Sequence, residues 1–200
     1  MRPLNFYSLF FLLLMTRFTY AQDCCTTQKN PWIFGLGANV INDSGLKFRG
    51  ITDIQNNYNY NIPLRITLEK RFQENFGIEI ATNFNTFLKG KTVNNSVLEE
   101  DISFFALDGM FNYYFSNTYQ IKERASYEAY LTSGLGVSFY DGSAATTANI
   151  GTGIYYYLSA SVGLNLNAIT KFSIDNSLSG SNYLQIGIGF IIKLEDSYFN

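Results

Sequence analysis

Apolar side chains alternate with small or polar ones along most of this chain, and this period of two constrains its fold more than any other feature. The segment 184–194 shows the pattern clearly: its even positions are Leu, Ile, Ile, Phe, Ile and Leu, and its odd positions are Gln, Gly, Gly, Ile and Lys. Successive side chains of a β-strand point to opposite faces, so this alternation is typical of strands. After Trp32 no segment shows the apolar stripe of an amphipathic helix. The pattern predicts an all-β fold.

Eight segments carry the alternation, and they predict one domain over 32–200 without repeats of long period. The predicted strands are 32–41, 62–72, 76–84, 105–115, 129–139, 154–164, 168–178 and 184–194. The predicted connections are 42–61, 70–75, 88–101, 116–126, 141–150, 165–168 and 179–182. The first, third, fifth and seventh of these would share one end of an up-and-down arrangement, and three of those four are long.

The face on which the apolar side chains lie decides the class of barrel. Eight antiparallel strands close into a barrel whose interior is just filled by side chains. A soluble lipocalin-like carrier of an apolar ligand would bury the apolar positions, whereas a transmembrane barrel shows them to lipid. Charged residues make up only 15% of the chain, and the polar positions are mostly Gly, Ser, Ala, Thr and Asn, a poor aqueous surface. We therefore predict an eight-stranded antiparallel up-and-down transmembrane β-barrel, with the soluble carrier as the alternative.

Aromatic residues, which are 17% of the chain, gather at the predicted strand ends. Rings at two levels form the girdles that flank the apolar band of transmembrane barrels. One predicted girdle comprises Trp32, Phe72, Phe76, Phe115 and Phe172, and the other comprises Phe84, Phe87, Phe105, Phe139 and Tyr183. Several predicted strands have ten or more residues, which matches the roughly 9–11 that a tilted strand needs to cross a bilayer.

The first residues predict export. Residues 1–21 read as a signal peptide, with Arg2, a short apolar core at 9–15 and a Thr-Tyr-Ala cleavage site at 19–21. Residues 22–31 then form an N-terminal leader that contains the two cysteines, Cys24 and Cys25. Adjacent cysteines pair with each other only in a strained ring, so we expect a flexible leader; a redox or intermolecular role is the alternative.

The residue inventory excludes several functions. The chain has no histidine, so a His-ligated metal and the Ser–His or Asp–His schemes of hydrolases are excluded. The net charge of −2 and the absence of a basic stripe argue against nucleic acid. We predict no catalytic, cofactor-binding or metal-binding residue. Five acids lie in the long connections, and we expect a solvated rim, with weak divalent-cation binding that bridges lipopolysaccharide as the alternative: Asp43, Asp53, Glu99, Glu100 and Asp101.

Charged residues on the inner phase predict an ion-pair network, because each charge in a narrow lumen must be paired or hydrated. The predicted members are Arg65, Glu69, Glu79, Asp108 and Lys193. The bulky inner residues Arg65, Tyr114, Tyr130, Tyr155 and Tyr157 indicate that the lumen is plugged. A gated narrow pore for ions or small solutes, in which one pair switches partners, is the functional alternative. The run 55–61, rich in Tyr and Asn, suits a recognition surface and equally an ordinary outward loop.

Two stretches resemble a known family. The opening WIFGLGAN at 32–39, followed by Asn-Asp-Ser-Gly at 42–45, is similar to the barrel start of OmpA-like proteins of Bacteroidota, and LQIGIGF at 184–190 resembles a terminal barrel strand. The resemblance is to small eight-stranded outer-membrane barrels of the OmpA/OmpX type and spans about 32–194. The peptidoglycan-binding domain of full OmpA proteins is missing, so cell-wall anchoring is not implied. The usual terminal aromatic is displaced, and either Phe190 or Phe199 would serve the assembly machinery.

The resemblance implies where and with what such a protein works. It implies an integral outer-membrane location, contact with outer-membrane lipid and lipopolysaccharide, and folding by the barrel assembly machinery. Enzymes on such barrels use a histidine at the site, which this chain lacks. We therefore expect a non-enzymatic barrel that supports envelope integrity or surface recognition through its long loops, without a cofactor and with an unidentified extracellular partner.

Overall fold

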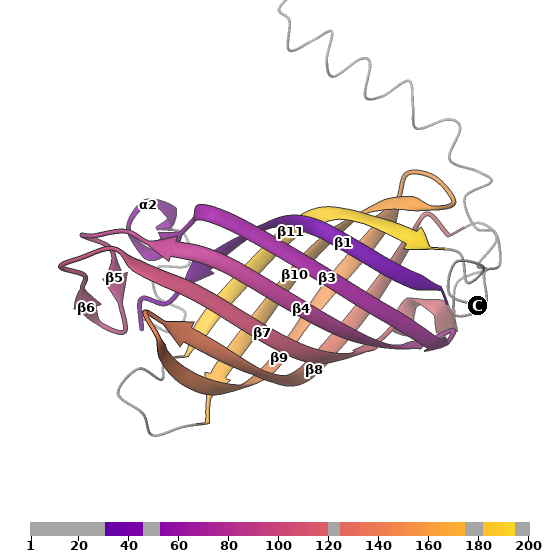
Figure 1. Ribbon diagram of the computed structural model, residues 1–200. Coiled ribbons are helices and arrows are strands. Elements are labelled where there is room, and N and C mark those ends of the chain that lie inside the picture. The colour runs from indigo at the N-terminus through magenta and orange to yellow at the C-terminus, as the bar shows by residue number, and fades with distance from the viewer. Residues whose placement is uncertain (1–30, 46–52, 120–124, 175–181, 195–200) are drawn as a thin grey trace, which may run out of the picture.

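Eight long strands form one closed sheet in the computed structural model, which describes residues 31–45, 53–119, 125–174 and 182–194 (Figure 1). The barrel strands are β1 (Trp32–Asn42), β3 (Asn61–Gln73), β4 (Phe76–Phe87), β7 (Ile102–Tyr113), β8 (Tyr127–Tyr140), β9 (Ser143–Tyr157), β10 (Val162–Ser173) and β11 (Tyr183–Leu194). The predicted signal peptide 1–21, Cys24, Cys25 and Phe199 lie outside the described residues.

Each barrel strand pairs antiparallel with the next along the chain, and β11 pairs with β1. The closing register runs from Trp32 opposite Leu194 to Asn42 opposite Leu184. Closure gives every barrel strand two neighbours, so no backbone edge is left without a partner strand. The predicted fold class, an eight-stranded antiparallel up-and-down barrel of the transmembrane type, is confirmed.

Short elements lie between the barrel strands. Between β1 and β3 these are α2 (Ile54–Asn57) and β2 (Tyr58–Asn59), and between β4 and β7 they are β5 (Thr92–Val93) and β6 (Ser96–Val97). After β7 the chain forms the 3-10 helix η2 (Phe115–Thr118). Among the residues that the structure describes, no helix is long and apolar enough to span a bilayer. We call the end with α2, β5 and β6 the loop end, and the end with residues 74–75, 114–119 and 158–161 the turn end.

The predicted boundaries of the sixth and seventh strands were wrong. The predicted strand 154–164 is interrupted by the turn 158–161, in which the amides of Leu158 and Ser159 donate to the carbonyl oxygen of Val162 at 2.9 and 3.0 Å. Tyr157 pairs with Gly163, so an odd number of residues separates the paired positions and the alternation continues across the turn without a change of phase. The predicted connection 165–168 lies inside β10, and the predicted loop 141–150 is a two-residue turn, Asp141–Gly142, followed by strand.

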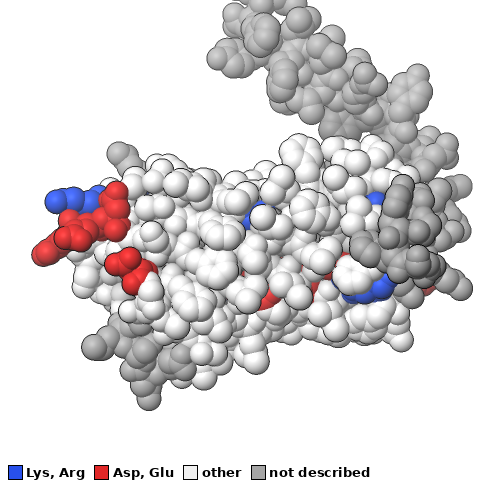
Figure 2. All heavy atoms as spheres, viewed as in Figure 1, with Lys and Arg blue, Asp and Glu red and all other residues white. Residues whose placement is uncertain are grey.

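The outer wall of the barrel is apolar. Large outward side chains are widely exposed, Leu36 at 50% and Ile188 at 60% among them, whereas inward neighbours such as Asn39 are buried. Figure 2 shows that charged side chains gather at the loop end, while the wall shows few charged atoms. A soluble carrier would instead bury its apolar side chains inside the barrel and show polar ones on its outer wall. The apolar belt consists of Phe34, Leu36, Leu68, Ile78, Ile80, Leu107, Phe111, Leu131, Leu135, Ile150, Leu166, Ile188, Phe190 and Ile192.

The aromatic residues at the strand ends fall into two groups. At the turn end Phe76 packs on Phe72, Phe111 and Tyr113, with ring centroids 5.2–6.2 Å apart. Trp32 begins β1 at the same end, and Phe115 lies there in η2. At the loop end Phe84, Phe105 and Phe139 form an outward ladder with centroids 5.0 and 5.7 Å apart.

Three residues predicted for the girdles lie elsewhere. Phe172 was predicted for the turn-end group, but it is the second-last residue of β10 and faces Ala148 at the loop end. Tyr183 and Phe87 lie at the predicted end but point inward, with 2% and 0% of their surface exposed. The physical reason is parity: Tyr183 shares the inward phase of Gln185, and Phe87 that of Asn85.

Candidate functional site

The middle of the lumen holds a network of buried charges. Arg65 donates from Nη2 to Glu79 Oε1 and from Nη1 to Asn83 Oδ1, both at 2.9 Å. Lys171 lies 2.7 and 2.6 Å from the two carboxylate oxygens of Asp108. Asn83 joins the two ion pairs, because its Nδ2 donates to Asp108 Oδ2 at 2.9 Å. The ion pairs therefore form one connected unit across the lumen, which we call the central network.

Two amides from the opposite wall complete the central network. Asn149 on β9 donates to Asp108 Oδ1, and Gln185 on β11 donates to Asn83 Oδ1, each at 2.9 Å. The network thus ties β3, β4 and β7 to β9, β10 and β11 through the interior. Charge-assisted hydrogen bonds of this kind fix side chains in one arrangement.

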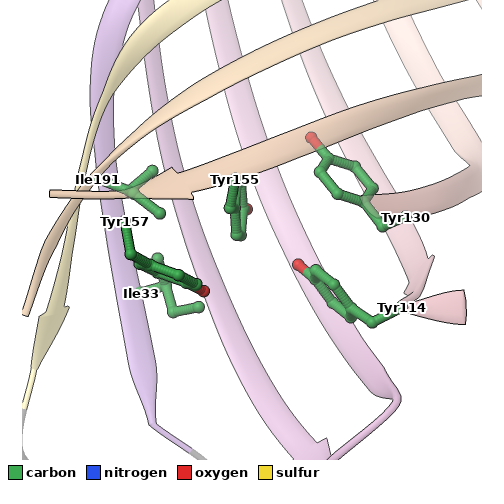
Figure 3. Packing of buried hydrophobic residues seen from close by; sticks show 6 residues of the cluster. All are labelled: Ile33, Tyr114, Tyr130, Tyr155, Tyr157 and Ile191. Atoms are coloured by element: carbon green, nitrogen blue, oxygen red, sulfur yellow. The ribbon is translucent and has the colours of Figure 1, made fainter. Parts of the chain in front are cut away.

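A second group closes the turn end. Glu69 accepts hydrogen bonds from the hydroxyls of Tyr114 and Tyr155, at 2.6 and 2.9 Å to Oε2, and from Nε of Arg71 at 3.0 Å to Oε1. The Arg71 guanidinium lies 3.3 Å from the centroid of the Tyr114 ring. Figure 3 shows four tyrosines pointing together into the barrel with two isoleucines; this tyrosine cluster comprises Ile33, Tyr114, Tyr130, Tyr155, Tyr157 and Ile191.

A second carboxylate anchors the same end. Glu128 accepts from Arg71 Nη2 at 2.8 Å and from Asn117 Nδ2 at 2.9 Å, and the Tyr157 hydroxyl donates to it as well. Lys193 lies over the Tyr157 ring, with its Nζ 3.7 Å from the centroid. Asn117 belongs to η2, so the connection after β7 is pinned against the mouth of the barrel at the turn end.

The loop end is closed by apolar residues. The mouth cluster consists of Ile41, Phe87, Val93, Phe104, Ala106 and Tyr183, and Leu98, Ile102 and Tyr140 pack against it. Phe87 stacks on Phe104 at 5.1 Å, and Tyr183 meets Phe104 edge-on at 5.7 Å. Val93 comes from β5, so the second loop supplies part of the cover over the lumen.

The first two loops hold each other in place. The amides of Asn94 and Asn95 donate to the carbonyl oxygens of Asp43 and Ser44 at 2.7 and 3.2 Å. Asn94 and Asn95 have φ values of 47° and 63°, the left-handed conformation that a tight hairpin turn of two residues requires. We call residues 43–45, 53–60 and 88–101 the loop platform.

The structure brings some predicted lumen residues together and separates others. Arg65 and Glu79, both predicted members of the ion-pair network, form an ion pair with each other. Glu69 and Asp108 pair instead with Arg71 and Lys171, which were not among the predicted members. Lys193 lies at the turn end, over the ring of Tyr157, whose hydroxyl donates to Glu128. The inward charges on the described strands balance: Arg65, Arg71, Lys171 and Lys193 against Glu69, Glu79, Asp108 and Glu128.

Three members of this set were not predicted from the sequence. Arg71 follows Glu69 by two positions and Lys171 follows Ile169 by two, so both share an inward phase that the alternation already indicated. Lys171 was missed because β10 was misplaced. Glu128 precedes the first alternating apolar residue of its strand, and only its contacts reveal it.

The predicted loop residues have different surroundings. Asp43 is fully buried, Asp53 accepts a hydrogen bond from Asn56 at 3.0 Å, and Asp101 accepts one from the amide of Lys89 at 2.7 Å. Within the described ranges no group of three or more His, Cys, Asp or Glu side chains could hold a metal ion. The Tyr- and Asn-rich run turns partly inward, since Asn57, Tyr58 and Asn59 are buried and Tyr60 is 51% exposed.

Little space remains inside the barrel near the wall at β1 and β11. A hollow of about 10 Å³ lies there, lined by Gly35, Gly37, Arg65, Asn167 and Gly189 among others. Such a volume holds about one water molecule. Arg65 Nε and Asn167 Oδ1, which both belong to residues that line it, make no hydrogen bond to described protein atoms. The lumen is thus filled at three levels: the mouth cluster, the central network and the tyrosine cluster with Glu69, Arg71 and Glu128.

Comparison by sequence finds no matching family model and no matching curated protein. Comparison by structure finds similar barrels. Neisserial surface protein A (NspA) has a TM-score of 0.58 at 13% identity, covering 82% of this chain and 96% of that chain. The outer membrane protein OprG from Pseudomonas aeruginosa has a TM-score of 0.57 at 14% identity, covering 84% and 98%. The N-terminal β-barrel domain of OprF from the same organism has a TM-score of 0.50 at 12% identity, covering 82% and 98%. At these identities the likeness shows a common fold.

Proposed function

We propose that this protein is an integral outer-membrane barrel whose work is done outside the lumen, by recognition at the cell surface through the loop platform. The observation that carries the proposal is the combination of a lumen filled at three levels with two loops that fix each other through backbone hydrogen bonds. A pre-formed surface binds partners at a lower entropic cost than a mobile loop.

The apolar belt supports the membrane location. Its side chains would cost free energy in water, about 25 cal/mol for each Å² of apolar surface, and gain that energy in lipid. The barrel strands have 11–15 residues, and a tilted strand needs roughly 9–11 to cross a bilayer. Two similar structures are those of Neisserial surface protein A and of the outer membrane protein OprG, which agrees with this location.

A role without catalysis agrees with the same geometry. The charged groups of the central network are held in ion pairs and are nearly inaccessible, with side-chain exposures of 0–5% for Arg65, Glu79, Asp108 and Lys171. A general acid or base must reach its substrate within hydrogen-bonding distance, and these groups bond to one another and to the neighbouring side-chain amides of Asn83 and Asn149.

A narrow pore is the second candidate, because several inward polar atoms make no hydrogen bond to described protein atoms. They include Asn112 Oδ1, Thr132 Oγ1, Thr147 Oγ1 and Asn149 Oδ1. Buried polar atoms without a protein partner are usually hydrogen-bonded to water. A chain of water molecules past the central network would be the start of a conducting path.

Planar-bilayer recordings separate the two candidates. We expect no stable single-channel current from the purified protein, because side chains fill the lumen at three levels. Stable currents from the unmodified protein would establish the pore instead.

Surface recognition needs its own test. Trypsin added to intact cells should cut the protein at Lys89 or Lys91 in the exposed second loop, and the barrel should stay intact. The purified protein in lipid nanodiscs is then applied to arrays of immobilised glycans and extracellular-matrix proteins, with a Tyr60→Ala, Val97→Ala variant as the test and Leu131→Ala on the belt as the control. Binding that the platform variant leaves unchanged, or no binding at all, would count against the proposal.

A further inference from the structure

The second loop contains a small hairpin whose outer strand has a neighbour on one side only. β6 pairs with β5 and with no other strand among those that the structure describes. Figure 1 shows both strands projecting past the end of the barrel wall. Ser96 and Val97 are both exposed, and Val97 is 65% exposed although it is apolar. The outer side of β6 is therefore an open strand edge.

The backbone groups of Val97 point to this open edge. Along an antiparallel strand, successive residues direct their N–H and C=O groups alternately toward the paired strand and away from it. The Leu98 amide donates to the carbonyl oxygen of Lys91 at 2.9 Å, so Leu98 faces β5. Val97 comes directly before Leu98, and its N–H and C=O therefore face away from β5. An open edge of this kind can accept a further strand from another chain.

The hairpin that carries the open edge is held in place from its inner side. Val93 of β5 is buried in the mouth cluster, and Leu98 packs against the same cluster. The amides of Asn94 and Asn95 in the turn donate to carbonyl oxygens of the first loop. The edge is thus formed before a partner arrives, so an added strand orders only itself and loses less conformational entropy.

Carboxylates lie close to the open edge along the chain. Positions 99–101, which follow β6 after Leu98, are Glu, Glu and Asp, and all three are exposed. The loop platform as a whole has five acids against two bases, a net charge of −3, and Figure 2 shows mostly acidic atoms at this end. Such a surface attracts a cationic partner and disfavours an anionic one. The charged residues of the platform are Asp43, Asp53, Lys89, Lys91, Glu99, Glu100 and Asp101.

We propose that the outer edge of β6 binds an extended, basic segment of a partner protein as an added strand, with Lys or Arg side chains of that segment against Glu99 and Glu100. The inference rests on the function proposed above and names the class of partner. Only a polypeptide backbone offers donors and acceptors that match both the N–H and the C=O of Val97. The backbone bonds supply affinity, and the carboxylates select for positive charge.

Peptide binding to the full protein in nanodiscs tests this inference. The nanodiscs contain phosphatidylcholine alone, because anionic lipids would themselves bind a basic peptide, and empty nanodiscs are the blank. The probe is a labelled peptide in which lysine alternates with threonine around a central valine. One matched peptide carries glutamine in place of lysine. Another keeps the lysines but is N-methylated at adjacent central amides, which blocks both of its edges. Fluorescence anisotropy gives the Kd of each peptide.

We expect the lysine peptide to bind about three- to tenfold more tightly than the glutamine peptide, which is the range of two exposed ion pairs. The methylated peptide should not bind. Glu99→Gln with Glu100→Gln should remove the advantage of lysine, whereas Asp141→Asn, which removes an exposed acid of another loop, should keep it. Val97→Pro should abolish binding, because proline lacks the outward N–H that the hairpin itself does not use. Val97→Thr keeps this N–H and should bind as the unmodified protein does.

Each other outcome overturns a defined part of the inference. Equal Kd values for the lysine and glutamine peptides, or an advantage that survives the loss of both glutamates, overturn the selection for charge. Binding of the methylated peptide overturns strand addition, and this result needs no variant to fold. If no peptide binds while the arrays described above show binding that the platform variant loses, the class of partner is wrong and the proposed function stands. Array binding that is absent or unchanged in that variant contradicts the proposed function itself.

Discussion

At the scale of single residues, the charged side chains of the central network are held in ion pairs. Lys171 is fully buried and Asp108 nearly so, and their atoms approach to 2.6 Å. Removing one member of a buried pair leaves an uncompensated charge, whereas removing both leaves a neutral lumen. The central network therefore stabilises the barrel only while both members of each ion pair are present.

Lys171→Met tests this dependence. We expect the free energy of unfolding in lipid vesicles to fall by about 3–5 kcal/mol, because Asp108 loses its cation. The double variant with Asp108→Asn should recover much of that loss, since the two residues interact directly. Lys89→Met, at an exposed loop position, is the control and should change the value little. An equally small effect at Lys171 would mean that water reaches Asp108 freely.

Glycine at the barrel closure makes a second prediction at this scale. Gly189 lies opposite Gly37 in the β1–β11 pair, and a methyl carbon placed on it would lie 2.7 Å from the carbonyl oxygen of Leu36. Gly189→Ala should lower the unfolding free energy by about 1–3 kcal/mol, because the backbones must separate. At Gly109 the nearest atom would be 4.0 Å away, so Gly109→Ala should not destabilise the barrel. Equal effects of the two alanines in urea titration would contradict this account.

At the scale of elements, the sequence predicted strands better than turns. Inward and outward positions follow from alternation alone, which is why Arg65, Glu79 and Tyr155 were assigned to the lumen correctly. Alternation does not mark a turn that leaves the inward phase unchanged, so the break at 158–161 between the paired residues Tyr157 and Gly163 was invisible to it. Which charges pair across the lumen depends on the register between strands, and no local pattern in the sequence specifies that register.

The turn between β8 and β9 makes the prediction for this scale. Asp141 and Gly142 both have positive φ, 46° and 86°, as a two-residue hairpin of the right twist requires. Gly142→Ala should cost about 1–2 kcal/mol, because a side chain is disfavoured in left-handed backbone. Asp141→Asn should be tolerated within about 0.5 kcal/mol, as asparagine adopts this conformation readily. Folding yield into vesicles and urea midpoints measure both; tolerance of alanine would argue against this turn type.

At the scale of the whole molecule, closure of the sheet and filling of the lumen mean that the barrel should unfold as one cooperative unit. Every barrel strand has two neighbours, and the central network ties opposite walls together. Detergent competes with lipid for the belt and leaves these internal bonds intact. Stability should therefore persist in detergent at low temperature and be lost only when the whole sheet opens.

Gel mobility checks this expectation. The outer-membrane fraction should yield a band of altered mobility when unheated, and the band should shift to that of the extended chain after boiling. The combined Lys171→Met, Gly189→Ala variant should shift at a lower temperature than the unmodified protein, with Gly109→Ala as the control. A protein recovered in the soluble fraction with no heat-dependent shift would contradict the membrane assignment.

The backbone contact between the two loops of the loop platform affects which substitutions this surface tolerates. Asn94 and Asn95 meet Asp43 and Ser44 through main-chain groups, and the neighbouring Ser96 and Val97 are exposed. A contact made by the backbone tolerates most replacements of nearby side chains. Substitutions at the exposed positions 96 and 97 can therefore change the chemistry of the loop platform without changing the backbone shape that holds it.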